Sequence, residues 1–179
     1  MAIAVHPEKP ATPAAAVGVA KHRVTSDQVW HQLDKASFAV VSYVTPAGEP
    51  RSSGVVYKTV ARRLYIAVAP DSWKARHISA GKQVSVTIPV ARGGILALAM
   101  PIPPATISFH ATAMVHSPES VEAESLVKQL GSLLPPERRH AAVLVELIPE
   151  GDFLAYGIGV SLMDMQKPKL ARTVVPVVG

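Results

Sequence analysis

Apolar and polar residues alternate in short runs, separated by turn signals, from Ser37 to Pro89. The first run, SFAVVSYVT, is β-branched and aromatic and predicts a strand. A Pro-Ala-Gly-Glu turn at 46–49 leads to a second strand over 50–58, and a break at 61–63 leads to a third over 64–68. Another strand is predicted over 83–88, so this half of the chain is expected to form an antiparallel meander.

Three helices are predicted around these strands. The first spans 26–36, where Thr25 and Gln28 have the spacing of a capping box. The second begins at Asp71 or Ser72 and ends at Gly81. The third spans 117–131, with a Ser-Pro start and a glycine stop.

The remaining strands are predicted over 106–116 and 141–148. Between 89 and 104 runs an apolar, Gly- and Pro-bounded connection, expected to pack on the core, in a dimer contact or over a pocket. Six mostly antiparallel strands with peripheral helices predict a mainly β protein built as a small closed barrel. We divide the chain into a Pro/Ala-rich arm at 1–23, mobile or lying on a partner, a barrel domain at 24–150, and a tail at 151–179 that packs on the barrel or a partner.

Composition narrows the function classes. The chain has 49% hydrophobic and 17% charged residues, which is typical of a folded domain. It has no cysteine, which excludes disulfides and thiolate metal sites and fits a reducing compartment, so we expect the cytoplasm. No apolar run reaches the roughly 20 residues of a membrane span, and prolines interrupt the N-terminal segment, so neither a span nor a secretory signal is expected.

The net charge of +5 raises the question of an acidic partner, such as a nucleic acid or an acidic ligand. The basic residues are scattered in pairs and aromatic residues make up only 5% of the chain, which disfavours nucleic-acid binding. A basic balance also suits a small acidic ligand, such as a phosphorylated cofactor.

Ser72-Trp73-Lys74 is the first candidate binding motif. A capped helix start points unpaired amide groups outward, where a phosphate would accept hydrogen bonds and pair with Lys74. Arg51 and Arg76 are expected at the same end of the barrel. The alternative is an ordinary solvated helix start.

A second candidate lies in the middle of the second strand, at Ser52-Ser53-Gly54-Val55-Val56. Small residues there let a flat ring approach the backbone, whose amides and carbonyls would bond the polar edge of a flavin-like ring. The alternative is a β-bulge.

The other reactive residues support no motif. His110 and His116 share a predicted strand face but lie about 20 Å apart, too far to chelate one metal. Haem ligation by a single histidine, His77, His110, His116 or His140, stays open. No nucleophile elbow, Walker motif or GxGxxG occurs, so we assign no catalytic side chain and no metal site, and a cofactor is expected to carry any chemistry.

The order and spacing of four segments resemble the flavin-binding split β-barrel superfamily, which includes the pyridoxamine 5′-phosphate oxidase-like proteins and the deazaflavin (F420)-dependent reductases. The segments are FAVVSY at 38–43, PAGEPR at 46–51, RLYI at 63–66 and SWKARHI at 72–78. The resemblance is clear over 25–88 and extends to about 148.

This resemblance implies a homodimer with two cofactor sites at the subunit interface. The strand after the Pro-Arg turn supplies ring contacts, and the third strand and the Ser-x-Lys helix supply phosphate contacts. These roles fall on Arg51, Ser52, Ser53, Gly54, Val55, Val56, Ala67, Val68, Ser72, Trp73 and Lys74. Trp73 departs from the basic or small polar residue of many relatives, and the 91–104 connection is longer and more apolar than the usual hairpin.

Three functions follow. The first is an FMN- or F420-dependent oxidoreductase that transfers hydride to or from a small apolar, conjugated substrate. The second is a non-catalytic protein that holds flavin, haem or a tetrapyrrole. The third is a structural protein whose barrel is filled by its own side chains.

Overall fold

The computed structural model of the chain describes residues 24–69, 72–92, 104–116 and 143–178. The predicted arm at 1–23 and the predicted helix at 117–131 lie outside the described residues, as does most of the apolar connection. The elements are α1 (Ser26–Lys35), β1 (Phe38–Val44), β2 (Pro50–Val60), β3 (Arg63–Val68), α2 (Trp73–Gly81), β4 (Gln83–Val90), β5 (Ala105–His116), β6 (Val143–Tyr156), η2 (Asp164–Gln166), α5 (Pro168–Ala171) and β7 (Arg172–Pro176).

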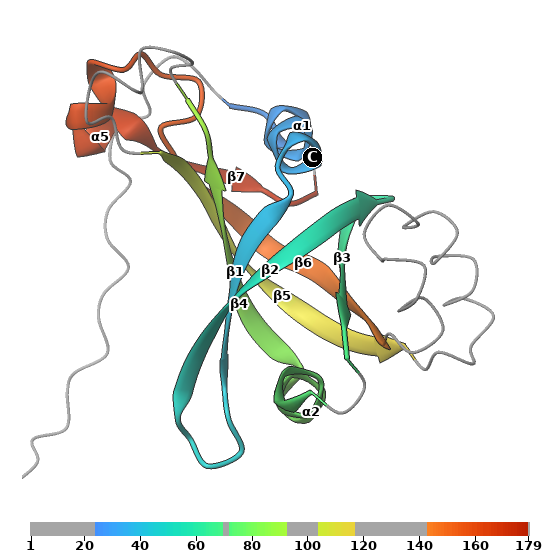
Figure 1. Cartoon of the computed structure of the whole chain (residues 1–179). Helices are drawn as coiled ribbons and strands as arrows, with labels where there is room; N and C mark the ends of the chain where they lie inside the picture. Colours follow the sequence, from blue (N-terminus) through green and yellow to red (C-terminus); the bar gives the residue numbers. More distant parts are fainter. Residues whose placement is uncertain (1–23, 70–71, 93–103, 117–142, 179) are drawn as a thin grey trace, which may run out of the picture.

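Six antiparallel strands close into a barrel. The sheet order is β3-β2-β1-β4-β5-β6-β7, and β3 also pairs with β6, which closes the ring of the first six strands (Figure 1). The predicted six-stranded antiparallel barrel is therefore confirmed. The seventh strand, β7, pairs with the end of β6 and was not predicted.

The strand predicted over 141–148 was too short, because β6 continues to Tyr156. The segment Pro149-Glu150-Gly151-Asp152 has the composition of a turn, and Gly151 has a left-handed φ of +68°. The ladder between β5 and β6 shifts register between Ser108 and His110, so the turn-like residues lie within an irregular but continuous strand.

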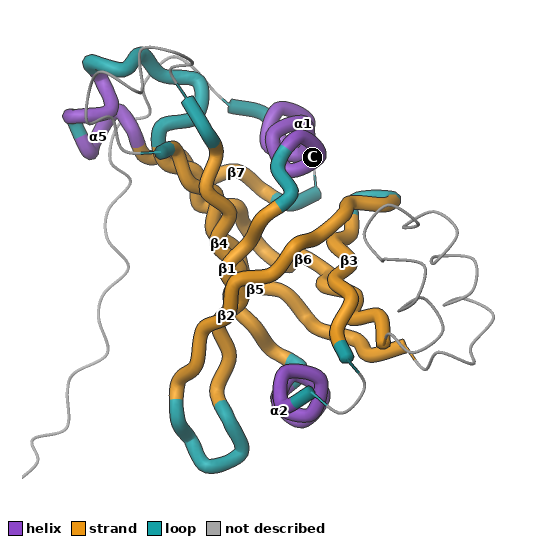
Figure 2. Tube along the Cα trace, viewed as in Figure 1, coloured by secondary structure: helices purple, strands orange, loops and turns teal. Residues whose placement is uncertain are grey.

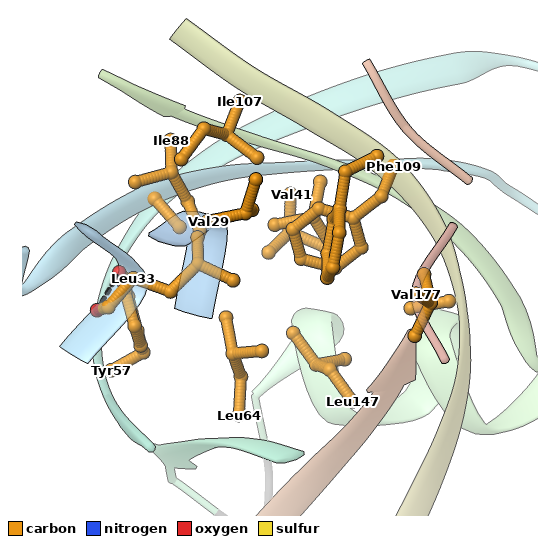
Figure 3. Close-up of a cluster of buried hydrophobic side chains, with 14 of the residues drawn as sticks. Val29, Leu33, Val41, Tyr57, Leu64, Ile88, Ile107, Phe109, Leu147 and Val177 are labelled. Carbon is orange, nitrogen blue, oxygen red and sulfur yellow. Dashed lines mark hydrogen bonds between the residues drawn. The ribbon is translucent and has the colours of Figure 1, made fainter. Parts of the chain in front are cut away.

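The core fills the barrel and one of its ends. Helix α1 directs Val29 and Leu33 toward apolar side chains of the strands, including Leu64 and Leu147 (Figure 3). The buried hydroxyl of Tyr57 donates a hydrogen bond of 2.7 Å to the carbonyl of Leu33, which anchors the helix end to β2. Helices α1 and α2 lie at opposite ends of the strands (Figure 2).

Local sequence signals account for the ends of the helices. The Thr25 hydroxyl accepts a 3.3 Å bond from the Gln28 amide, and the Gln28 side chain accepts one of 3.0 Å from the Thr25 amide. This capping box was predicted. Helix α1 ends at Lys35, one residue before the predicted end. Ser72 is the N-cap of α2, and the predicted stop at Gly81 is confirmed.

Candidate functional site: a fork between strands β2 and β3

Strands β2 and β3 separate partway along the barrel. They pair from Val60↔Arg63 to Tyr57↔Ile66 and no further, whereas β2 continues beside β1 to Val44↔Pro50. Beyond this point β3 stays with β6. The two strands thus form the arms of a fork, and α2 lies below the separation (Figure 1).

Both arms present main-chain groups to the fork. The Tyr57 amide donates to the Ser37 carbonyl at 3.0 Å, so Tyr57 and every second residue before it point their N–H and C=O toward β1. The alternate residues Ser52, Gly54 and Val56 point theirs away from β1. The Tyr57↔Ile66 register joins the Val56 carbonyl to the Ala67 amide, and among the described residues no strand pairs with the edge at Ser52 and Gly54. By the same alternation, Ala67 on β3 turns its N–H and C=O toward β2.

The side chains of β2 alternate between the two faces of the sheet. Ser53 is buried, while Ser52, Gly54 and Val56 face outward. The Ser52 and Ser42 hydroxyls lie 2.8 Å apart across the outer face. The register with β1 is continuous from 50 to 56, so the alternative of a β-bulge is wrong for this segment.

Gly54 has a neighbour that the sequence did not reveal. A Cβ placed on Gly54 would lie 2.9 Å from two ring carbons of Phe38, so the Phe38 ring occupies the space above the glycine. Phe38 is 46% exposed and faces Val56 across the strands. The small residue therefore leaves room for an aromatic ring, but that ring belongs to the protein.

Arg51 is held at the β1–β2 hairpin. Its guanidinium lies 2.7 Å from the Glu49 carboxylate, whose hydrogen bond and charge raise the pKa of Arg51. Its cross-strand neighbour is Tyr43, whose ring centroid lies 6.1 Å from that of His77 on α2. The hairpin arm and α2 therefore meet at the end of the barrel where the fork opens.

The other predicted residues follow the second arm. Ala67 and Val68 pair with Leu144 and Val143 of β6. The Ser72 hydroxyl accepts from the Ala75 amide at 3.3 Å, and Lys74 is half-buried in the first turn of α2. Trp73 is the first residue of that helix. The predicted residues thus fall on the two arms of the fork and on the helix start that follows it.

A buried charge cluster lies on the outer side of the β3–β6 closure and was not predicted. Glu146 is 3% exposed and accepts hydrogen bonds from Arg63 at 2.5 Å and from Tyr65 at 3.0 Å. The His116 Nε2 lies 2.7 Å from the other carboxylate oxygen. Burial acts to raise the pKa of Glu146, but the bonds from Arg63, His116 and Tyr65 outweigh it and lower the pKa. The sequence signal that could have indicated this cluster is Glu146 itself, the single acidic residue in the apolar run VLVELI at 143–148.

Two hollows flank α1 at the opposite end of the barrel. The larger, of about 570 Å³, lies between the helix and the β2–β3 turn and is lined mainly by polar residues that include Asp27, His31 and Arg62. The smaller, of about 430 Å³, shares Asp27 and His31 and adds Ile158. Neither is lined by a predicted cofactor residue.

Two further searches covered the described parts of the chain. No helix there is long and apolar enough to span a membrane. No three His, Asp or Glu side chains there gather closely enough to hold a metal ion. Of the histidines considered for haem, His110 is exposed, His116 contacts Glu146, His77 contacts Tyr43, and His140 lies outside the described residues.

Solved structures of other proteins share the fold of this chain. No family model and no curated protein matches the chain. HutZ, the haem storage protein from Vibrio cholerae, matches with a TM-score of 0.61 at 16% identity, covering 74% of this chain and 95% of that one. An FAD-binding protein from Mesorhizobium loti matches with a TM-score of 0.54 at 13% identity, covering 71% and 91%. An F420 reductase matches with a TM-score of 0.50 at 16% identity, covering 69% and 93%.

At these identities the likeness shows the fold. The chain has the split-barrel fold of the pyridoxamine 5′-phosphate oxidase-like and F420 reductase-like proteins, which confirms the resemblance seen in the sequence. The three matched proteins are named for haem, FAD and F420.

Proposed function

We propose that the chain binds FMN or F420 in the fork between β2 and β3 and acts as an oxidoreductase on a small apolar, conjugated substrate. The observation that carries this proposal is the unpaired edge of β2. At Ser52 and Gly54 it offers alternating donors and acceptors, which suit the polar edge of a flavin or deazaflavin ring. From the opposite arm Ala67 adds its carbonyl, because its N–H bonds the Val56 carbonyl.

The start of α2 supplies the phosphate side of the proposed site. A helix N-terminus carries a partial positive charge, and Lys74 in its first turn adds a full one. Ser72 fixes the position of this turn through its bond to Ala75, and Trp73 lies between them in the sequence. No acidic residue occurs from Ser72 to Gln83, so nothing within this stretch opposes an anion.

The bound ring would supply hydride transfer, and the protein would bind and orient it. The β2 edge would fix the ring plane, while the hairpin with Arg51 and the start of α2 would border it. We assign no catalytic side chain, because positioning of ring and substrate is the contribution that these residues can make.

A second subunit is part of the proposal. A fork open on one side needs another surface to enclose a ring, and the outer face of β1 and β2 exposes Phe38, Val44 and Val56 at 46%, 57% and 58%. Apolar side chains gathered on one face favour association. We propose a homodimer that covers this face, and light scattering on the purified protein tests it by the mass in solution.

Titration of the cofactor-stripped protein with FMN and with F420, followed by ring fluorescence, tests the main proposal. We expect one of them to bind and Lys74→Ala to weaken binding by roughly 10- to 100-fold, the size of a charge-assisted hydrogen bond. Lys58→Ala is the matched control, because Lys58 lies on β2 where it pairs with β3. Failure of both cofactors to bind would refute the proposal, and equal effects of the two variants would remove Lys74 from the site.

Haem storage without turnover is the second candidate. A histidine that binds a metal usually bonds a carboxylate through its other nitrogen, and His116 has such a carboxylate in Glu146 at 2.7 Å. Haemin titration distinguishes this candidate. It predicts a Soret band that shifts in His116→Ala, whereas the flavin proposal predicts no specific haem complex.

A further inference from the structure

We propose that Phe38 is a ligand-contact residue that forms one wall of the ring site in the fork. This inference rests on the proposed function and adds a residue that the family resemblance did not indicate. Phe38 lies on β1, outside every segment expected to contact cofactor, and only the cross-strand geometry brings it to Gly54.

Gly54 faces both the fork and the ring of Phe38. Its N–H and C=O point into the fork, where a bound ring would lie about 2.9 Å from the nitrogen or oxygen. Its Cα faces the Phe38 ring, with two ring carbons 2.9 Å from the position of the missing Cβ. One residue therefore offers its backbone to the ligand and its open side to Phe38, which puts ligand and aromatic ring in reach of each other.

The position of Phe38 along β1 also supports contact between Phe38 and the ligand. It is opposite Val56, whose carbonyl makes the last bond between β2 and β3 before the fork opens. It is 46% exposed, so about half of the side chain remains available to pack against a ligand. A flat conjugated ring is the ligand that such an aromatic face fits best.

A pair of tryptophan variants tests contact directly. Trp in contact with a flavin or deazaflavin ring quenches its fluorescence, so Phe38→Trp is expected to quench the bound FMN or F420 strongly. Val174→Trp is the matched control. Val174 is 60% exposed on β7, which pairs with β6 and is part of neither arm of the fork. Equal quenching in both variants, or none in either, would overturn the inference.

A double-mutant cycle tests whether the packing of the Phe38 ring against Gly54 contributes to cofactor binding. Gly54→Ala places a methyl group where the Phe38 ring lies, so it displaces the ring, and Phe38→Ala removes it. Each change is expected to weaken cofactor binding by roughly threefold to tenfold, the size of one aromatic contact. Because both remove the same wall, the double variant should bind about as weakly as either single one. Multiplied effects, or no effect of Phe38→Ala, would refute the role of Phe38.

Light scattering on each variant separates this role from subunit association. Phe38→Leu keeps an apolar side chain on the outer face, so it should keep the mass of the wild type yet bind cofactor more weakly. A loss of affinity that follows only a change in mass would contradict a contact role. If the wild type binds neither FMN nor F420, the proposed function fails first. If it binds one and all Phe38 variants match it, only the inference fails.

Discussion

Replacement of Glu146 by alanine should destabilise the protein more than any other change to a charged residue in the described chain. The substitution removes the acceptor of Arg63, Tyr65 and His116 together. Tyr65 is 5% exposed and the His116 side chain 12%, so each would lose its bond to the carboxylate away from water, at about 1–3 kcal/mol apiece. The Arg63 side chain is 49% exposed and can turn to solvent, so it adds little.

These contributions sum to about 2–6 kcal/mol, a large part of the stability of a domain of this size. Urea denaturation of wild type and variant, at equal slope, measures the difference. Glu150→Ala is the matched control, because Glu150 lies on the same strand, is exposed and bonds only Thr112 among the described residues. It should change stability by less than about 0.5 kcal/mol. A Glu146→Ala loss no larger than that of Glu150→Ala would refute the reasoning.

The same cluster predicts a pH dependence. The pKa of Glu146 is lowered in the folded protein, so the unfolded chain binds a proton more readily. The stabilisation is therefore complete above the ordinary value of 4.5 and is lost as the pH falls through the lower folded pKa. Glu146→Gln lacks this titration, so the gap in free energy of unfolding between it and wild type should narrow over that range. A gap that stays constant with pH would show that Glu146 does not titrate as the structure indicates.

Two further predictions concern the attachment of α1. Thr25→Ala removes half of the capping box and should lower the free energy of unfolding by about 1 kcal/mol, with Thr173→Ala, on the edge strand β7, as a control that should change little. Tyr57→Phe leaves the buried Leu33 carbonyl without its 2.7 Å donor and should cost about 1–3 kcal/mol, measured by the same denaturation; an unchanged midpoint would mean that water replaces the bond.

The split-barrel fold could be predicted because its signals are local. The capping box at Thr25 and Gln28 lies within one helical turn, and the alternation along β5 sets which side chains enter the core. The β1–β2 turn and the break before β3 are likewise encoded by adjacent residues. Each of these signals acts over a few residues, so the sequence by itself determined the order and approximate bounds of α1, α2 and most strands, whereas η2 and α5 were not predicted.

Other features depended on which strands meet. Strand β7 has one buried residue, Val175, and its pattern is too weak to reveal a strand until β6 lies beside it. The turn-like residues around Gly151 remain in a strand because β5 on one side and the chain near Val177 on the other bond them. Only the closed barrel decided these pairings.

Only part of the candidate site could likewise be predicted from the sequence. The sequence indicated the residues from Arg51 to Val56 and the capped start of α2, because small residues and an N-cap are local signs. It did not indicate that β2 and β3 part at Tyr57, that Phe38 covers Gly54, or that three strands converge on Glu146. These contacts join residues far apart in the chain, and their geometry follows from strand register, which only the tertiary structure decided.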